Sequence, residues 1–201
     1  AGAAIGSNVV AKRLYSTVNV QETTPSLWLT ASEMAFCKAE GVLRGWNMGG
    51  GTAKEYYERG VTLSFNQWGV DGAATYLLDD TSTEANYADA LGGFGGAAAK
   101  ASTITIKWDD NAPMDEKMER LITQKWIALF PNGQEAWNEI RRTGYPRIFS
   151  VPQATNGYTL LTPNRIPFDK NQQINNRSNY DKAVELLGGP DDYATPMWWQ
   201  R

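Results

Sequence analysis

Residues 124–146 constrain the fold of this chain most strongly, because they predict two amphipathic helices joined by a tight turn. Apolar residues recur at helical spacing on both sides of Pro131-Asn132-Gly133. Gly144 follows the second run and Pro146 lies just beyond it, an arrangement that ends helices. The stretch therefore predicts a helical hairpin, with its helices at roughly 115–130 and 134–142.

Capping signals predict a second hairpin upstream. Thr30 with Glu33, and again Thr52 with Glu55, have the spacing of a capping box. In this motif the threonine hydroxyl bonds an amide of the first turn and the glutamate reaches back to the cap. Glycines end both runs, and alanines along one face of the first helix allow the second helix to approach closely.

The pattern predicts a mainly α fold of tetratricopeptide-like helix pairs, with loop excursions and little β structure. Residues 1–201 form one unit in this interpretation. Its parts are a first helix pair at 26–69, a loop excursion at 70–111, a second pair at 115–145 and a loop-rich tail at 146–201 with one short helix, Ser178 to Leu187. Within the excursion we expect a short helix at Thr83–Leu91 and a β-prone run at Thr103–Trp108. The polar, irregular segment 1–25 suggests a fragment of a longer protein.

Composition excludes several classes of function. The chain has no histidine, which removes Ser-His-Asp and Cys-His nucleophiles and His-ligated zinc. A net charge of -3 without basic runs argues against a nucleic-acid partner. The lone Cys37 forms no intrachain disulfide and is expected to be a small buried thiol. We predict no cofactor, no metal and no catalytic residue. Three acidic doublets are interpreted as solvated turn residues: Asp79-Asp80, Asp109-Asp110 and Asp191-Asp192.

Aromatic residues are the better candidates for ligand binding, since eight tryptophans and nine tyrosines supply flat, polar-edged rings suited to sugars. The candidates lie in the excursion rather than on a helix face: Tyr76, Tyr87, Phe94 and Trp108. Trp126 and Trp137 have helical spacing and are expected in the core. The helical pairs Glu40–Arg44 and Glu139–Arg142 are expected to be ordinary surface ion pairs.

Several blocks, in order, resemble SusD/RagB-type nutrient-binding proteins, surface lipoproteins of the outer membrane of Bacteroidetes. They are Trp28-Leu29-Thr30-Ala31-Ser32-Glu33, the runs 39–46, 56–61 and 64–70, the helical hairpin 124–146, Arg165-Ile166-Pro167-Phe168, the run 187–191 and the final Trp198-Trp199. The resemblance covers about residue 26 to the end, so the chain is similar to the C-terminal part of such a protein.

The resemblance implies a helical scaffold that binds oligosaccharide or polysaccharide at the cell surface without breaking it. It also implies delivery to a SusC-like TonB-dependent transporter, and anchoring in the outer membrane through a lipidated N-terminal cysteine absent from this chain. Peptide or protein cargo, as in other tetratricopeptide domains, is the alternative. A glycoside hydrolase is a third hypothesis, which predicts turnover that depends on an acidic doublet.

Overall fold

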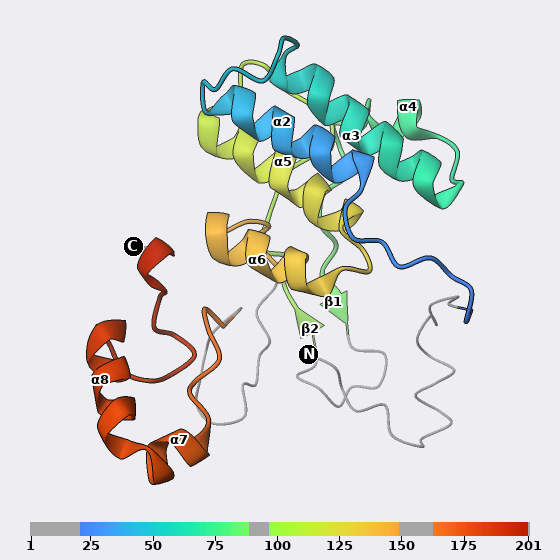
Figure 1. The fold of residues 1–201 in the computed structure, drawn as a ribbon. Helices are drawn as coiled ribbons and strands as arrows, with labels where there is room; N and C mark the ends of the chain where they lie inside the picture. Colours follow the sequence, from blue (N-terminus) through green and yellow to red (C-terminus); the bar gives the residue numbers. More distant parts are fainter. Residues whose placement is uncertain (1–20, 89–96, 149–162, 201) are drawn as a thin grey trace.

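The computed structural model describes residues 21–88, 97–148 and 163–200. Within these ranges the protein is mainly helical, and its one sheet is a two-stranded antiparallel ribbon that pairs Tyr87 with Ala98. The prediction of a mainly α fold with little β structure is confirmed (Figure 1). The elements are α2 (Ala31–Leu43), α3 (Ala53–Trp68), α4 (Ala73–Tyr76), β1 (Tyr87–Ala88), β2 (Ala97–Ala98), α5 (Met114–Ala128), α6 (Gly133–Thr143), α7 (Lys170–Asn175), α8 (Arg177–Leu187) and the 3-10 turn η1 (Trp198–Gln200).

The capping signals act as predicted at the starts of α2 and α3. Thr30 accepts a hydrogen bond from the Glu33 amide at 3.1 Å. At α3 the whole capping box forms, because Thr52 accepts from the Glu55 amide and the Glu55 carboxylate accepts from the Thr52 amide. Gly69 ends α3 in the left-handed conformation, at φ 63°, where glycine carries no steric cost.

Close contact between α2 and α3 depends on Gly60. A Cβ atom at this position would lie 2.7 Å from the ring of Phe36, which is fully buried. The Ser32 hydroxyl of α2 donates to the Gly60 carbonyl at 2.7 Å. The absent side chain therefore leaves the space that the Phe36 ring occupies and lets a buried hydroxyl reach the neighbouring backbone.

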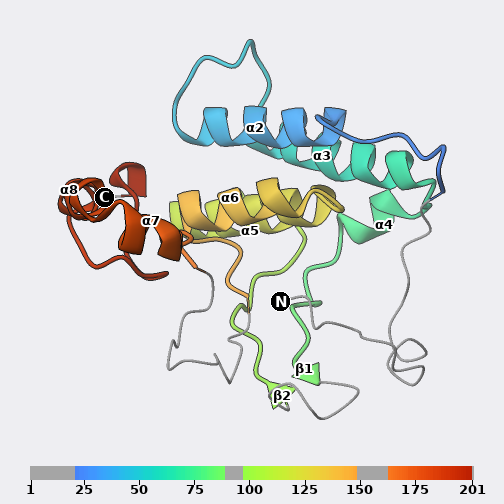
Figure 2. The ribbon, with the colours of Figure 1, turned by 60° about the horizontal axis from the view of Figure 1, so that its bottom comes forward.

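The two hairpins stack as layers, with α2 and α3 above α5 and α6 (Figure 2). Helix α5 packs against both α2 and α3, and α6 packs against α5. Leu121 and Ile122 of α5 are fully buried at this junction, as is Tyr57 of α3. A hydrophobic core shared by α2, α3 and α5 thus joins the two layers.

The excursion departs from its predicted local structure. Residues 83–86 are not helical and β1 begins at Tyr87, while 89–91 lie outside the described residues. The β-prone run 103–108 forms no strand. Its carbonyls instead accept side-chain donors, from Arg120 to Thr105 at 3.0 Å and from Tyr57 to Ile106 at 2.5 Å. Side chains of the helical layer therefore replace a neighbouring strand as hydrogen-bond partners.

The tail contains the predicted short helix, α8, which ends at Gly188 with φ 68°. The helices α4 and α7 and the 3-10 turn η1 are not among the predicted elements. The chain end is attached to α6 through stacking: the Arg141 guanidinium lies 4.1 Å from the Trp137 ring centre and 4.8 Å from that of Trp199. Gln200 adds a 3.0 Å hydrogen bond to the Arg141 carbonyl.

Across the described parts of the chain, none of the helices combines the length and apolar character needed to span a bilayer. Cys37 is half-buried on α2, less enclosed than predicted.

Candidate functional site

The four aromatic candidates do not form one site. Tyr76 ends α4, Tyr87 lies in β1, Trp108 precedes α5, and Phe94 lies outside the described residues. Tyr87 is half-buried. Contact between Tyr87 or Phe94 and a ligand stays a prediction.

Trp108 belongs to the core, contrary to the expectation of an accessible loop ring. Its side chain is only 7% exposed, and its ring lies 5.1 Å from that of Tyr57. The indole N–H donates to Asp110 at 2.8 Å, which satisfies the polar edge at the surface. The loop that carries Trp108 packs inward because Tyr57 bonds the neighbouring Ile106 carbonyl. A packing role accounts for this residue.

Tyr76 is half-buried and faces α5. Its hydroxyl donates to Gln124 at 3.0 Å, and its ring packs 5.2 Å from that of Phe65. Burial raises the pKa of the Tyr76 hydroxyl, so this group remains a neutral hydrogen-bond donor in ordinary conditions. Tyr76 also lines a cavity of about 280 Å³ beside α5.

Trp126 and Trp137 are both half-buried rather than core residues. Trp126 lines the same 280 Å³ cavity, and the Trp137 indole donates to the Pro163 carbonyl at 2.8 Å.

A larger cleft, of about 930 Å³, lies where three distant segments meet. The residues before α2 form one wall, the end of α3 another, and the α5–α6 turn the third. Two indoles are accessible there: Trp28 is 87% exposed, and Trp68 is 46% exposed with its ring 5.8 Å from that of Phe130. Exposed apolar rings that gather at a cleft are a mark of a ligand-binding groove.

Polar groups line the same cleft. They are the side chains of Glu33, Glu135, Asn132 and Gln67. Partial burial raises the pKa of Glu33, and the negative charge of Glu135 adds to this effect against the opposing charge of Lys125. The Asn132 side chain already caps α6 by accepting from the Glu135 amide at 3.3 Å. The cleft thus combines flat apolar faces with hydrogen-bonding carboxyl and amide groups, the chemistry that pyranose rings need.

None of the predicted ligand-binding residues that the structure describes lines this cleft. In the sequence, Trp28 and Trp68 both lie in blocks that carry the family resemblance, and neither is among the predicted ligand-binding residues. The available signal was that Trp28 precedes a helix cap in a segment with no periodicity of its own. No local pattern brings Trp28 near Pro131, so the cleft depends on tertiary packing.

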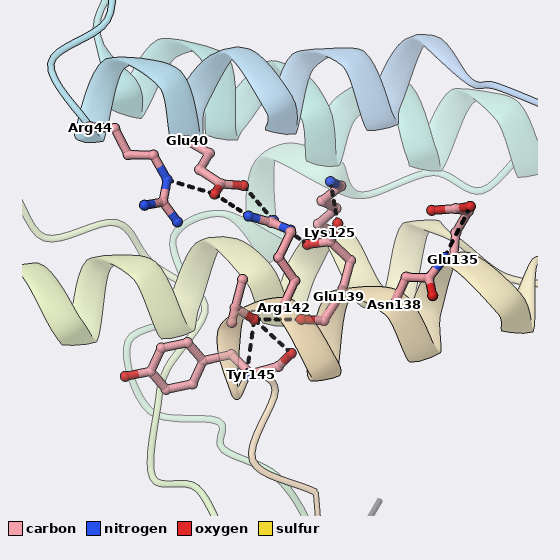
Figure 3. Close-up of polar contacts among 9 residues, drawn as sticks. Glu40, Arg44, Lys125, Glu135, Asn138, Glu139, Arg142 and Tyr145 are labelled. Carbon is pink, nitrogen blue, oxygen red and sulfur yellow. Dashed lines mark hydrogen bonds and ion pairs between the residues drawn. The ribbon is translucent and has the colours of Figure 1, made fainter. Parts of the chain in front are cut away.

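A charge network between the helical layers joins α2, α5 and α6 (Figure 3). Arg142 donates to both carboxylate oxygens of Glu40, at 2.6 and 2.7 Å, and to Glu139 at 2.7 Å. Lys125 donates to the other oxygen of Glu139 at 2.8 Å, and Arg44 donates to Glu40 at 2.8 Å. Bidentate geometry of this kind gives both strength and directional specificity.

The expectation of ordinary surface pairs is therefore wrong for this network. The side chains of Glu40 and Glu139 are 9% and 8% exposed, because α6 lies over α5 and closes the space. Burial raises the pKa of Glu40, but the Arg142 hydrogen bond and charge outweigh that effect and the net pKa is lowered. The pKa of Lys125 is raised, since its bond to Glu139 outweighs burial.

One acidic doublet also departs from its interpretation as solvated turns. The Asp191 side chain is 4% exposed, and it accepts from Arg165 at 2.5 Å and from the Phe168 amide at 3.0 Å. Asp79 does behave as a turn residue, accepting from the amides of Thr81 and Ser82. In the part of the chain that the structure describes, no three acidic or cysteine side chains gather as metal ligands.

Comparison with known proteins gives a consistent result. The SusD-like family, described as Susd and RagB outer membrane lipoprotein, matches residues 1–200. A search of curated proteins finds no match. A SusD homolog from Bacteroides uniformis superposes with a TM-score of 0.84 at 42% identity, covering 93% of this chain and 39% of that one.

Two further solved structures agree. A chitin-binding SusD homolog from Flavobacterium johnsoniae has a TM-score of 0.78 at 44% identity, covering 87% of this chain and 36% of that chain. A SusD-like protein from Bacteroides thetaiotaomicron has a TM-score of 0.79 at 46% identity, covering 88% and 37% respectively. The chain thus spans less than half the length of the structures it resembles.

Proposed function

The chain belongs to the SusD-like family of outer-membrane lipoproteins, and from this premise we propose that it is part of a surface receptor that binds glycan. The similarity to a chitin-binding homolog at 44% identity makes chitooligosaccharide the natural probe. The receptor hands its glycan to a SusC-like TonB-dependent transporter in the outer membrane and is held there by a lipidated N-terminal cysteine. It captures the glycan and does not cleave it.

The exposed indoles of the cleft are the structural observation that supports glycan binding. Trp28 and Trp68 stand at the opening of the 930 Å³ cleft, a volume suited to several sugar units rather than one. Each ring offers a face on which a pyranose can stack and shed water from both apolar surfaces. Because both rings line the same cleft, one oligosaccharide that occupies the cleft can contact both.

Hydrogen bonds from the cleft walls orient the stacked sugars. The carboxyl groups of Glu33 and Glu135 and the amide of Gln67 accept from or donate to hydroxyl and acetamido groups. The buried network of Glu40, Glu139 and Arg142 holds α2 against α6 and so fixes the spacing of two cleft walls. A cleft that is rigid before binding loses less conformational entropy when the glycan binds.

Calorimetric titration of the chain with chitohexaose tests the proposal. We expect saturable binding with micromolar to millimolar affinity and no release of reducing ends on long incubation. Detectable hydrolysis that disappears in Glu33→Gln would overturn the non-catalytic part. The raised pKa of Glu33 makes it the residue at which a general acid would first be sought.

Peptide cargo is the competing function, and the same titration separates the two. An unstructured peptide of mixed sequence serves as the second probe. Binding of the peptide together with indifference to chitohexaose and to other neutral oligosaccharides would replace the glycan proposal with the peptide alternative.

A further inference from the structure

The walls of the 930 Å³ cleft carry two carboxyl groups without a matching cation. Glu33 comes from the first turn of α2 and Glu135 from the first turn of α6, and both residues are half-buried. Among the described residues that line the cleft, none is a lysine or an arginine. A ligand that enters the cleft therefore meets negative charge beside the exposed indoles.

The groups around the two carboxylates leave this charge largely uncompensated. Lys125 acts on Glu33 through its charge, but its side chain is only 5% exposed and donates to Glu139 at 2.8 Å. Glu135 accepts from the Asn138 amide at 3.4 Å, a long contact with a neutral donor (Figure 3). The cation closest to this region is thus bound to another carboxylate below the surface of the cleft.

The charge on Glu33 is poorly stabilised in the protein. Burial raises the pKa of the Glu33 carboxyl group, and the negative charges of Glu135 and Glu139 raise it further against the charge of Lys125. Glu40 shows the opposite behaviour, because hydrogen bonds from arginine outweigh burial and lower its pKa. A cation placed beside Glu33 would supply the stabilisation that Glu40 already has.

Sugar stereochemistry determines which part of a glycan meets these carboxylates. In a β-linked ring of the glucose type the substituents are equatorial, so a flat face can stack on Trp28 or Trp68 while the group at carbon 2 lies at the ring edge. The ring edge of a stacked sugar faces the cleft walls. A protonated amino group at carbon 2 donates charge-assisted hydrogen bonds to a carboxylate, whereas an acetamido group donates a neutral one.

We propose that the cleft prefers oligosaccharides of β-linked glucosamine, the deacetylated form of the chitin unit, with ammonium groups on Glu33 and Glu135 and rings on the two indoles. The preference rests on the proposed glycan-binding function and narrows its substrate class to cationic amino sugars. Chitohexaose binds through the same indoles, but more weakly.

Three probes test the preference by calorimetric titration at low salt and slightly below neutral pH, where sugar amines are protonated: the glucosamine hexamer, chitohexaose and hexalysine. The two sugars share their backbone, and hexalysine carries the charge without the sugar. Since a charge-assisted hydrogen bond exceeds a neutral one by about tenfold in affinity, we expect the glucosamine hexamer to bind about tenfold more tightly than either other probe. Added salt should narrow the difference between the sugars, because it screens charges at a solvent-open site.

The double variant Glu33→Gln with Glu135→Gln removes both charges and keeps the size of the side chains. Glu55→Gln is the matched control, since Glu55 is also the third residue of a helix but does not line the cleft. We expect the double variant to bind both hexamers with equal affinity and E55Q to keep the tenfold preference. A preference that survives in the double variant would overturn the role of the two carboxylates.

Two outcomes on the unaltered chain would also overturn the proposal. Equal affinity for the two hexamers would remove the preference, and hexalysine binding as tight as that of the glucosamine hexamer would remove the sugar assignment. If the double variant does not fold, the three probes on the unaltered chain still decide.

Failure of this proposal is distinguishable from failure of the proposed function. If both hexamers bind equally and Trp28→Ala weakens both, the cleft binds glycan without selecting its charge. If neither hexamer binds, glycan binding itself fails.

Discussion

Replacing Arg142 by glutamine tests whether the buried charge network holds the two helical layers together. Arg142 is the residue through which Glu40 of α2 and Glu139 of α6 are joined, and it lies 102 residues from Glu40 in sequence. The substitution removes three charge-assisted hydrogen bonds of 2.6 to 2.7 Å and leaves two carboxylates in a nearly buried space.

The size of the stability loss depends on the ion-pair partners that each carboxylate keeps. Removing one partner of a fully buried ion pair costs about 3–5 kcal/mol. Here Glu40 keeps Arg44 and Glu139 keeps Lys125, and the Arg142 side chain is itself 38% exposed, so solvent moderates the loss. We therefore expect Arg142→Gln to lower the free energy of unfolding by about 2 kcal/mol.

Urea unfolding followed by far-UV circular dichroism measures this change. Arg177→Gln is the matched control, because Arg177 pairs with Asp181 on an exposed face, where solvent screens the ion pair and its loss should change stability little. The double-mutant cycle with Glu40→Gln should give a coupling energy of about 1–2 kcal/mol. Equal effects of R142Q and R177Q, or a coupling energy near zero, would refute a structural role for the network.

Three further predictions follow from the packing and the charges. The pKa of Glu40 is lowered in the folded protein, so ionised Glu40 stabilises the fold above the ordinary pKa of 4.5 and this stabilisation is lost as the pH falls. Between about pH 5 and 3, the urea midpoint of Glu40→Gln should therefore fall less steeply than that of the unaltered chain. Parallel pH profiles of the two proteins would contradict this. Gly60→Ala should destabilise, because overpacking against Phe36 costs about 1–3 kcal/mol and exceeds the gain of about 1 kcal/mol in helix propensity, whereas Gly133→Ala, with open space at its Cβ position, should be neutral or stabilising in the same assay. Asp191→Asn should loosen the tail, since Asp191 holds both Arg165 and the Phe168 amide, and limited proteolysis should cleave within 163–200 several times faster; unchanged cleavage would indicate that other contacts hold the tail.

Local signals made most helices predictable. The Thr52 capping box, the Gly69 stop and the apolar spacing around 124–142 each depend on residues a few positions apart, and each forms as expected. Helix α4 has only four residues and no side-chain cap, so no comparable signal marked it.

Long-range contacts explain the errors. Trp108 is buried because Tyr57, in another helix, packs against it, and Glu40 is buried because Arg142 reaches it from α6. In both cases the residues nearby in sequence predict exposure: Trp108 lies in a loop, and Glu40 has the helical spacing of a surface ion pair with Arg44. The cleft was missed for the same reason, since its walls come from residues 24–29, the end of α3 and the α5–α6 turn.

A comparison of three proteins decides whether the exposed indoles of this cleft bind glycan. Chitohexaose affinity should be measured for the unaltered chain, for Trp28→Ala with Trp68→Ala, and for Trp46→Ala, whose 62% exposed indole does not line the cleft. We predict at least a tenfold loss of affinity, about 1.4 kcal/mol, in the double variant and none in W46A. Equal affinity in all three proteins would show that the cleft indoles do not bind chitohexaose.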